Sequence, residues 1–366
     1  MHSGTATTDE ERKEALLKKL YAVVDRPVRL MVVCSTQNRA ILRYGLLDQL
    51  PGYLDLVAGP GCSMCVMPAG HIDAFVKVAV QPDVITAACD DLVKTRGSTE
   101  SLESVMKKGA AIEIITSPME ALNIACRELD KTVVYPAVGF EATAPSVAET
   151  ILEAARLGVE NFCVIPSIRL LPPTIDLLMH DPDLNIQGLL CSDHINTISD
   201  AEAYTVLAKK HKIPCYIGGF EVENILEGIL YLVRQVRNCE SILDDTSAFT
   251  YSSDEKRKAG RMVSEVFFAV DTLWRGLGNI EQSGFVIRDE LSLFDAVKRF
   301  NIRFSEGEEQ CLCQCSDIIS GRGLPPDCPA FGMTCTPQTP IGPCMITDEG
   351  ICNSYLKYVA GSRSFI

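Results

Sequence analysis

The central part of the chain alternates between short apolar runs and amphipathic stretches. Between about residues 29 and 237, eight runs rich in Val and Ile are each followed by a polar or glycine-containing turn and a stretch with helical spacing. These runs are RLMVVC (29–34), LDLVAG (54–59), DVITAA (83–88), AAIEIIT (110–116), KTVVYPAV (131–138), NFCVIPSI (161–168), NIQGLLC (185–191) and IPCYIGG (213–219). Continuous apolar strands separated by helices are typical of parallel sheets that helices cover on both faces. The pattern therefore predicts an α/β fold.

Eight strands in about two hundred residues indicate two smaller α/β units rather than one large sheet. We expect the first unit to cover residues 1–130 and the second 131–240, with the break between the fourth and fifth strands. An amphipathic helix is expected near the N-terminus. The polar, serine-rich residues 240–262 predict a linker followed by a helix, and Trp274 is expected where a helix end docks on the neighbouring domain. The third region, 241–366, ends the chain.

The C-terminal part follows no hydrophobic period and is instead dense in cysteine. Seven of the sixteen cysteines lie between Cys311 and Cys352, with the spacing C-x-C-x-C-x12-C-x6-C-x8-C-x7-C. So much loop cannot bury enough apolar surface to offset its chain entropy, so disulfides or a metal must order it. Four thiolates can hold a zinc ion or a cubane iron–sulfur cluster, and the spacing alone does not choose between them. The surplus thiols could form a redox pair beside the centre.

Composition narrows the class of protein. A hydrophobic content of 47% and a charged content of 22% describe an ordinary globular chain, and no apolar run approaches membrane-spanning length. The net charge of -14 argues against a nucleic-acid binder. The N-terminus lacks a signal-peptide pattern. We therefore expect a cytoplasmic protein, in which clustered cysteines more often serve metal or redox chemistry than structural disulfides.

A second group of candidate residues lies where strands end and helices begin, which is the functional edge of α/β folds. Cys34 follows the first predicted strand, and Cys62 and Cys65 form a CxxC in the loop GPGCSMC after the second. If those two strands are neighbours, the three thiols project into one crevice. A position at a helix start would favour their thiolate forms. The alternatives are a redox-inert buried pair and a small core cysteine.

Glu141, in the loop PAVGFEATAP after the strand 131–138, is a further candidate. Its carboxylate could act as a general acid or base, or could only brace the loop. The sequence GGFE at 218–221 echoes this loop. His71 and His194 are isolated, and we expect them to pack or cap rather than to bind a ligand. Core positions are expected for Cys89, Cys126, Cys163, Cys191, Cys215 and Cys239.

Together the motifs GPGCSMC, PAVGFEATAP, GGFE and WRGLG-x4-SG, with the terminal CxC, CTP, GPCM and EGxC, resemble those of the hydrogenase maturation factor HypD family. The resemblance covers nearly the whole chain from about Arg29. It implies two α/β domains and a small C-terminal domain that holds a [4Fe-4S] cluster. It also implies a redox-active scaffold rather than a turnover enzyme. With a small HypC-type partner, such a scaffold carries the iron on which the Fe(CN)2CO group of [NiFe]-hydrogenase is assembled, and a HypE-type protein donates the cyanide.

The resemblance also assigns residues. The implied cluster ligands are Cys313, Cys328, Cys335 and Cys352. The implied redox dithiol beside the cluster is Cys315 with Cys344, and Cys311 is extra. The residues implied for transient iron binding and electron transfer in the crevice are Cys34, Cys62 and Cys65.

The crevice departs from the family pattern at several positions, among them Gln37. Gln37 stands where the family's CGTH motif has histidine, and an amide can neither bind metal like imidazole nor shuttle protons near neutral pH. Three alternatives to hydrogenase maturation are therefore kept. They are a cluster-dependent thiol–disulfide oxidoreductase, a divergent paralogue that serves another metallocentre, and a purely structural zinc protein.

Overall fold

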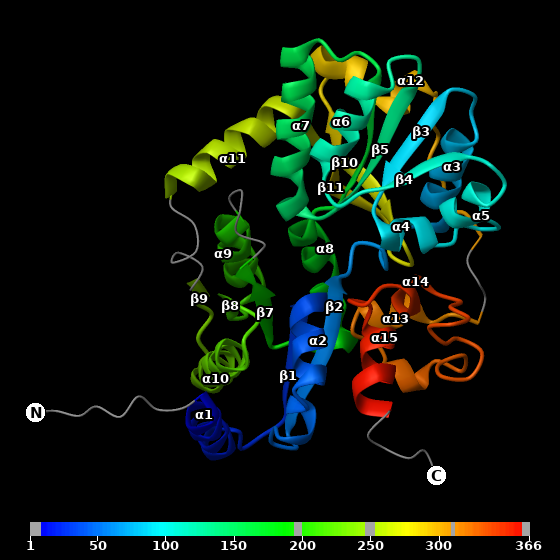
Figure 1. Ribbon diagram of the computed structural model, residues 1–366. Coiled ribbons are helices and arrows are strands. Elements are labelled where there is room, and N and C mark those ends of the chain that lie inside the picture. Colours follow the sequence, from blue (N-terminus) through cyan, green and yellow to red (C-terminus); the bar gives the residue numbers. More distant parts are fainter. Residues whose placement is uncertain (1–8, 194–199, 246–252, 309–311, 361–366) are drawn as a thin grey trace, which may run out of the picture.

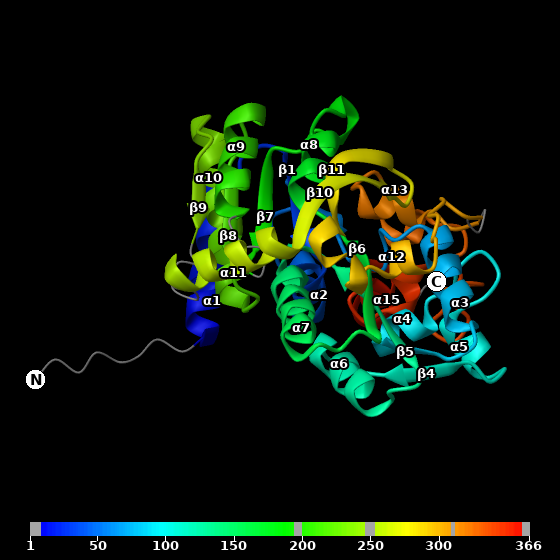
Figure 2. The same ribbon diagram turned by 90° about the horizontal axis from the view of Figure 1, so that it is seen from above.

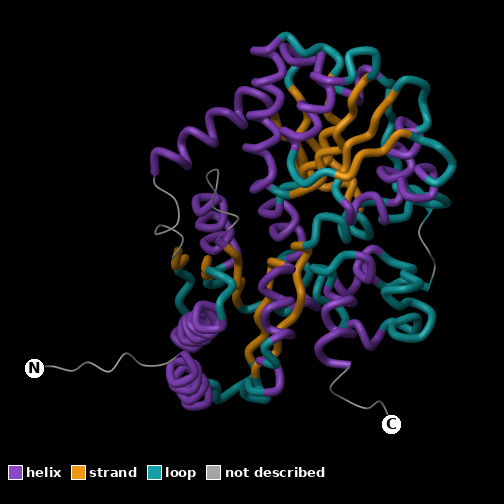
Figure 3. The backbone as a smooth tube through the Cα atoms, viewed as in Figure 1, coloured by secondary structure: helices purple, strands orange, loops and turns teal. Residues whose placement is uncertain are grey.

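The computed structural model describes residues 9–193, 200–245, 253–308 and 312–360 (Figure 1). In this part of the chain, two parallel sheets and one antiparallel hairpin are followed by a C-terminal region of loops and short helices. Figure 3 shows the strands in separate groups, with the loop-rich C-terminal region beside the lower group.

The first sheet has the order β2-β1-β7-β8-β9, and its paired strands are all parallel. Its strands are β1 (Val28–Cys34), β2 (Leu54–Gly61), β7 (Gly188–Ser192), β8 (Cys215–Gly218) and β9 (Leu243–Asp245). One face is covered by α1 (Asp9–Val23), α2 (Ser35–Arg43) and α10 (Val222–Asn238). The other face is covered by α8 (Leu171–Leu178) and α9 (Asp200–His211). Apolar side chains thus alternate between two cores, as expected of strands buried on both faces.

The second sheet has the order β4-β3-β5-β6 and is also parallel. Its strands are β3 (Val84–Ala88), β4 (Ala111–Ile114), β5 (Thr132–Gly139) and β6 (Phe162–Ile168). One face carries α3 (Ala69–Ala79), α4 (Asp90–Lys94) and α5 (Leu102–Met106). The other carries α6 (Pro118–Arg127), α7 (Ala144–Leu157) and α11 (Ser253–Val266), while α12 (Ala296–Arg299) packs on β6. Figure 2 shows the two sheets side by side, each with its own helices.

The eight predicted strands are all present, which confirms the α/β class, but the expected division of the chain is wrong for the sheets. Val84 of β3 pairs with Thr132 of β5, across the expected break at residues 130 and 131. The chain builds β1 and β2, crosses to build β3 to β6, and returns through α8 for β7 to β9. Hydrophobic runs determine where strands form, whereas strand pairing depends on long-range packing that the pattern does not encode.

The helix predicted after the polar linker is α11, but an unexpected hairpin follows it. Strands β10 (Phe267–Trp274) and β11 (Gly278–Ile287) pair antiparallel, so Trp274 ends a strand rather than a helix. Its buried indole Nε1 donates a hydrogen bond to Ser283 Oγ at 2.9 Å. Gly276 in the turn has a φ of +70°, and a Cβ there would lie 2.1 Å from the Cβ of Ser316. The hairpin turn therefore meets the C-terminal region closely, which only glycine permits.

The C-terminal region is built from loops and the short helices α13 (Cys315–Ile319), α14 (Pro343–Ile346) and α15 (Ile351–Tyr355). Helix α15 packs on α2, and α13 packs on β2, so this region docks on the first sheet (Figure 1). The expected N-terminal helix is α1. Among the helices that the structure describes, none combines the length and the apolar composition needed to cross a membrane.

Candidate functional site

The candidate thiols lie at the carboxyl edges of the two sheets, where the order of the strands reverses. In the first sheet β1 lies between β2 and β7, and its last residue is Cys34. In the second sheet β3 lies between β4 and β5, and Cys89 follows it directly. Ligands of open α/β sheets bind outside the carboxyl ends of the strands at such switch points. Each sheet therefore presents one cysteine where its topology favours a ligand site.

A cavity lies between the two edges. Cys62 lines it from the turn after β2, Cys89 and Val138 line it from the second sheet, and Glu349 lines it from the C-terminal region. The expectation that Cys89 is a core residue is wrong, because Cys89 is exposed. Residues from both sheets and from the cysteine-rich region therefore meet around one space.

The first two strands are neighbours, as the crevice hypothesis requires. Strands β1 and β2 pair in parallel, and the register places Cys34 opposite Gly61, the residue before Cys62. The Ser35 hydroxyl also donates a hydrogen bond to the Gly61 carbonyl at 2.8 Å. The backbone of Cys34 is thus fixed beside the start of the CxxC turn.

Cys34 lies at the N-terminus of α2, as expected, but burial opposes the expected thiolate. Burial raises the pKa of the Cys34 thiol, and this effect outweighs hydrogen bonds from Ser192 and from the backbone of Gln37 and Thr36, which lower it. The helix start therefore supplies donors to the sulfur, yet the half-buried thiol stays protonated to a higher pH than an exposed cysteine.

Cys62 and Cys65 form a disulfide, with their Cα atoms 5.2 Å apart. The pair lies in the turn between β2 and α3, and α3 begins only at Ala69, so the expected position at a helix start is wrong. The Cys65 N–H points to Cys62 Sγ at 3.2 Å. Cys65 is fully buried, whereas Cys62 lines the cavity. Chemistry at this pair would therefore proceed through Cys62.

Glu349 joins the cysteine-rich region to the helix that begins at Cys34. Its carboxylate accepts a hydrogen bond from Thr36 Oγ1 at 3.0 Å and one from Ser35 Oγ at 3.3 Å. Glu349 lies between α14 and α15, which carry Cys344 and Cys352. Its negative charge also contributes to the raised pKa of the Cys34 thiol. The C-terminal region thus contacts the first turn of α2, directly after Cys34.

Six cysteines of the C-terminal region line one small cavity. They are Cys313, Cys315, Cys328, Cys335, Cys344 and Cys352. Cys315 and Cys344 form a disulfide, with Cα atoms 6.5 Å apart. The other four cysteines are unpaired. The structure therefore separates the six into one disulfide and four free thiols.

The four free thiols form a donor set that suits a four-thiolate metal centre. Burial raises the pKa of the Cys352 thiol, and the neighbouring Cys313, Cys335 and Cys328 raise it further. Four thiolates in one buried cavity repel each other unless a cationic centre offsets their charge. The backbone is shaped around the sulfurs: the Ile341 N–H donates to Cys335 Sγ at 3.3 Å. These ligands fit a zinc ion or a cubane cluster.

A Cβ at Gly342 would lie 2.3 Å from Cys313 Sγ, so this position has room only for glycine. The requirement explains the glycine of the GPCM motif. The cysteine ligands and the backbone that surrounds them are therefore specified together by the local sequence.

Arg275 is a charged residue of this site that sequence reasoning missed. It is buried in the hairpin turn, where its backbone N–H donates to Val66 O at 2.8 Å and its Nε donates to Met67 O at 2.7 Å. Its charge lowers the pKa of Cys313, opposing the larger effect of burial. Arg275 thus connects the segment after the CxxC with the cysteine cavity. The signal was an arginine within WRGLG, but its partners lie about two hundred residues away in the chain.

Comparison with known proteins identifies the family. The family model HypD, described as the "Hydrogenase formation hypA family", matches residues 11–359. The chain belongs to the HypD family. It is 34% identical over 363 residues to the hydrogenase maturation factor HypD of Azotobacter vinelandii, covering 96% of each chain.

Two further relatives extend the comparison. The chain is 33% identical to HypD of Escherichia coli strain K12 over 335 residues, covering 91% of this chain and 90% of the relative. It is 32% identical to a putative hydrogenase expression/formation protein of Methanocaldococcus jannaschii over 342 residues, covering 93% and 95%. The resemblance derived from the motifs is therefore confirmed.

In this HypD-family chain Gln37 braces the crevice. Its side chain is fully buried, and Nε2 donates to the carbonyls of Cys191 at 3.1 Å, Gly218 at 3.0 Å and Gly219 at 3.2 Å. These carbonyls lie at the ends of β7 and β8. Gln37 therefore ties α2, and with it Cys34, to the carboxyl edge of the first sheet.

Glu141 of the HypD-family GFE motif is buried, and its carboxylate accepts a hydrogen bond from the Leu171 N–H. Leu171 is the first residue of α8, the helix through which the chain returns to the first sheet. This contact favours the bracing role of Glu141. Gly139 belongs to the same loop, and a Cβ there would lie 2.1 Å from Thr143 Oγ1.

The remaining candidates from the sequence are buried, exposed or outside the described residues. His71 is buried, stacks on Phe304 with ring centroids 4.0 Å apart and lies 3.4 Å from Arg169 Nη2, so it is packed as expected. His194 and Cys311 lie outside the described residues. Three of the expected core cysteines are buried, namely Cys163, Cys191 and Cys215. The expectation is wrong for the exposed Cys126 and Cys239.

Proposed function

We propose that this HypD-family chain is a redox-active scaffold on which a hydrogenase iron centre is assembled. The observation that carries the proposal is the bond of Glu349 to Ser35 and Thr36, because it joins two groups of cysteines. On one side is the cavity with four free thiols and a disulfide, and on the other are Cys34 and the cavity-lining Cys62. The names of the relatives as hydrogenase maturation factors support the same function.

The cysteine cavity is proposed as the electron-transfer end of the scaffold. The residues that would hold a [4Fe-4S] cluster are Cys313, Cys328, Cys335 and Cys352. When bound, such a cluster supplies one-electron transfer. Arg275 offsets negative charge at this end, because it is buried and lowers the pKa of Cys313. The adjacent Cys315–Cys344 disulfide takes up two electrons and two protons to become a dithiol.

The crevice is proposed as the end that receives iron. Reduction of Cys62–Cys65 by two electrons and two protons, supplied by an electron-carrier protein through the cysteine-rich region, frees two thiols. Ferrous iron is the substrate here, and it binds Cys34, Cys62 and Cys65 as their protons leave. A HypC-type small partner shares the iron, and a HypE-type protein donates cyanide. The reduced thiols that this scheme needs are compatible with the cytoplasm. Glu141 acts as a positioning residue through Leu171.

The test uses the full chain co-expressed with a HypC-type partner and purified without oxygen. Infrared spectroscopy of the complex should show cyanide and carbonyl bands, and iron analysis should give about five atoms per chain, against about four for a cubane alone. Cys34→Ala should lose the bands and the fifth iron. The exposed Cys126 on α6 supplies the control, and Cys126→Ala should keep both. A wild-type complex without bands and without extra iron refutes the scaffold.

A second candidate function is a cluster-dependent thiol–disulfide oxidoreductase. The specific observation in its favour is that the two cysteines of the CxxC form a disulfide and that one of them, Cys62, lines the cavity. This function predicts turnover of a protein dithiol with no iron beyond the cluster. A member that serves another metallocentre would instead keep the extra iron and lack the cyanide bands.

A further inference from the structure

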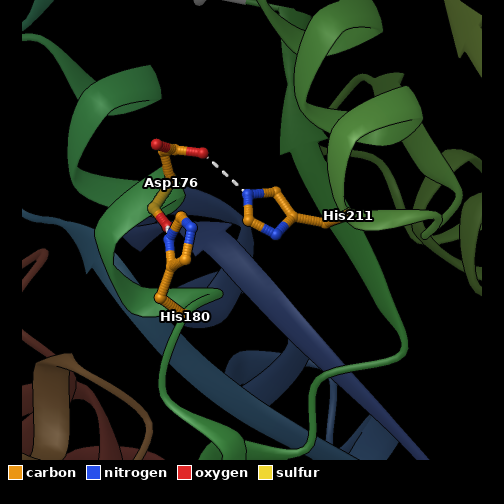
Figure 4. Close-up of side chains that lie close together, drawn as sticks. All are labelled: Asp176, His180 and His211. Atoms are coloured by element: carbon orange, nitrogen blue, oxygen red, sulfur yellow. Dashed lines mark hydrogen bonds and ion pairs between the residues drawn. The ribbon is translucent and has the colours of Figure 1, made fainter.

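The ends of α8 and α9 bring together two histidines and a carboxylate that the proposed function does not use. Asp176 lies in α8, His180 follows two residues after its end, and His211 is the last residue of α9. One ligand atom from each lies within 4.8 Å of the others. Figure 4 shows Asp176 and His180 one above the other on the same segment, with His211 reaching toward them from the neighbouring segment.

The rings are held in orientations that suit metal binding. His180 Nδ1 lies 2.6 Å from the backbone carbonyl of Asp176, a bond in which Nδ1–H donates and the Nε2 lone pair stays available. The His180 and His211 rings are nearly perpendicular, at 86°, with centroids 5.0 Å apart. They are therefore not stacked, and a ring nitrogen of each can face a shared point beside the carboxylate.

The Asp176 carboxylate already has a positively charged partner, the ammonium of Lys210. Lys210 Nζ lies 2.7 Å from the Asp176 carboxylate, and His211 Nε2 lies 2.7 Å from Asp176 Oδ1. Burial raises the pKa of Asp176, but these hydrogen bonds and charges lower it overall, so the group is an anion. Lys210 is half exposed and can turn to solvent. An ammonium thus pairs with the carboxylate that a metal cation would bind.

We propose that Asp176, His180 and His211 form a binding site for a divalent first-row transition ion, with zinc as the reference ion. Two imidazoles and one carboxylate favour such ions over Ca2+ and Mg2+, which prefer oxygen ligands alone. Three protein ligands leave a position for water. Because α8 carries the chain back from the second sheet, the ion would also clip this connection to α9 of the first sheet.

The test must distinguish this site from the cysteines, which also bind zinc. We suggest a zinc titration of the full chain, labelled with 13C at Cε1 of histidine and followed by NMR. The chain is purified without oxygen, with the metal or cluster of its cysteine cavity already bound. The ring signals of His180 and His211, assigned from His180→Gln and His211→Gln, should shift together and saturate at one zinc. Either substitution should weaken this binding by at least about 10- to 100-fold, the loss that removal of an outer-shell partner alone causes.

Two lysine variants sharpen the test. Lys210→Ala removes the competing ammonium and should tighten zinc binding about fivefold, the equivalent of one exposed ion pair. Lys209→Ala, one residue earlier on α9, should leave it unchanged. If zinc binds while both ring signals stay in place, or if Lys210→Ala weakens binding, the site is refuted. None of these readouts depends on iron assembly, so the outcome is separate from that of the proposed function.

Discussion

Replacing Gln37 should destabilise the crevice strongly, because this one amide connects three backbone carbonyls. Gln37→Met keeps most of the side-chain volume but removes the donor, whereas Gln37→Ala also opens a cavity. The amide has two hydrogens for three acceptors, at 3.0 to 3.2 Å, so one hydrogen is shared at any time. The comparison of the two variants separates hydrogen bonding from packing.

The size of the effect follows from the burial of the site. The bonds to Cys191 and Gly218 are buried, and each buried carbonyl left without its donor costs about 1 to 3 kcal/mol, so Gln37→Met should lose roughly 2 to 6 kcal/mol. Gln37→Ala should lose about 1 to 2 kcal/mol more through the cavity. The family's histidine, introduced by Gln37→His, offers one N–H donor at a time when neutral, and should fall between wild type and Gln37→Met.

Urea denaturation followed by circular dichroism measures these changes, provided that the slope with denaturant concentration is unchanged. Gln49 supplies a matched control, since its Nε2 also donates to two carbonyls, Tyr44 O and Gly45 O, but these hydrogen bonds are exposed to solvent. Gln49→Met should change the free energy of unfolding by less than about 0.5 kcal/mol. If Gln37→Met is no more destabilising than Gln49→Met, Gln37 does not brace the crevice.

Three other substitutions probe the charges around the site. Glu349→Gln should speed alkylation of Cys34 at a given pH, because removing the negative charge lowers the pKa of that thiol. Mass spectrometry of iodoacetamide-treated protein locates the alkylated residue. An unchanged rate of alkylation would contradict the contact between Glu349 and the start of α2. Arg275→Met should cost about 2 to 3 kcal/mol in urea denaturation, because it breaks a buried charged bond to Met67 O, and a loss below about 1 kcal/mol would contradict this. Burial lowers the pKa of His71 well below its usual value, so the unfolded chain binds the proton more readily. The free energy of unfolding should therefore decrease as the pH drops below about 6.5, by up to about 1.4 kcal/mol per pH unit. His71→Gln should flatten this dependence between about pH 7 and 5.

The fold could be predicted as far as local pattern determines it. The run at 131–138 became β5 and the run at 29–34 became β1, because each apolar run is bounded by a turn and followed by a helix. The assignment of strands to sheets could not be predicted. The pairing of β1 with β7 joins residues about 160 positions apart, and nothing local distinguishes that partner from β3. The hairpin of β10 and β11 was missed because apolar and polar residues alternate only weakly along its strands. Phe267 is buried and its neighbour Phe268 is exposed, yet both are apolar in the sequence.

The candidate site likewise contains residues that local sequence could locate and residues that it could not. Cys34 and Cys62 could be located from the strand ends, because parallel strands place their carboxyl ends at one edge. The role of Gln37 could not, since a buried amide and an exposed one look alike in sequence. Glu349 was not identified either: its partners lie in α2, more than three hundred residues away. Contacts between distant loops therefore account for most of what the sequence did not reveal.

The crevice sulfurs share a property that bears on the order of events in the proposed function. Cys62 and Cys65 are joined as a disulfide, and burial keeps the Cys34 thiol protonated. Neither form binds iron, so two separate conditions precede loading. In the proposed scheme, electrons first open the disulfide, and a cation then displaces the proton of Cys34, whose release burial opposes. Because Glu349 bonds beside Cys34 and comes from the cysteine-rich region, the proposed route of the electrons and the acidity of Cys34 would share one contact. Loading would therefore follow reduction, rather than compete with it.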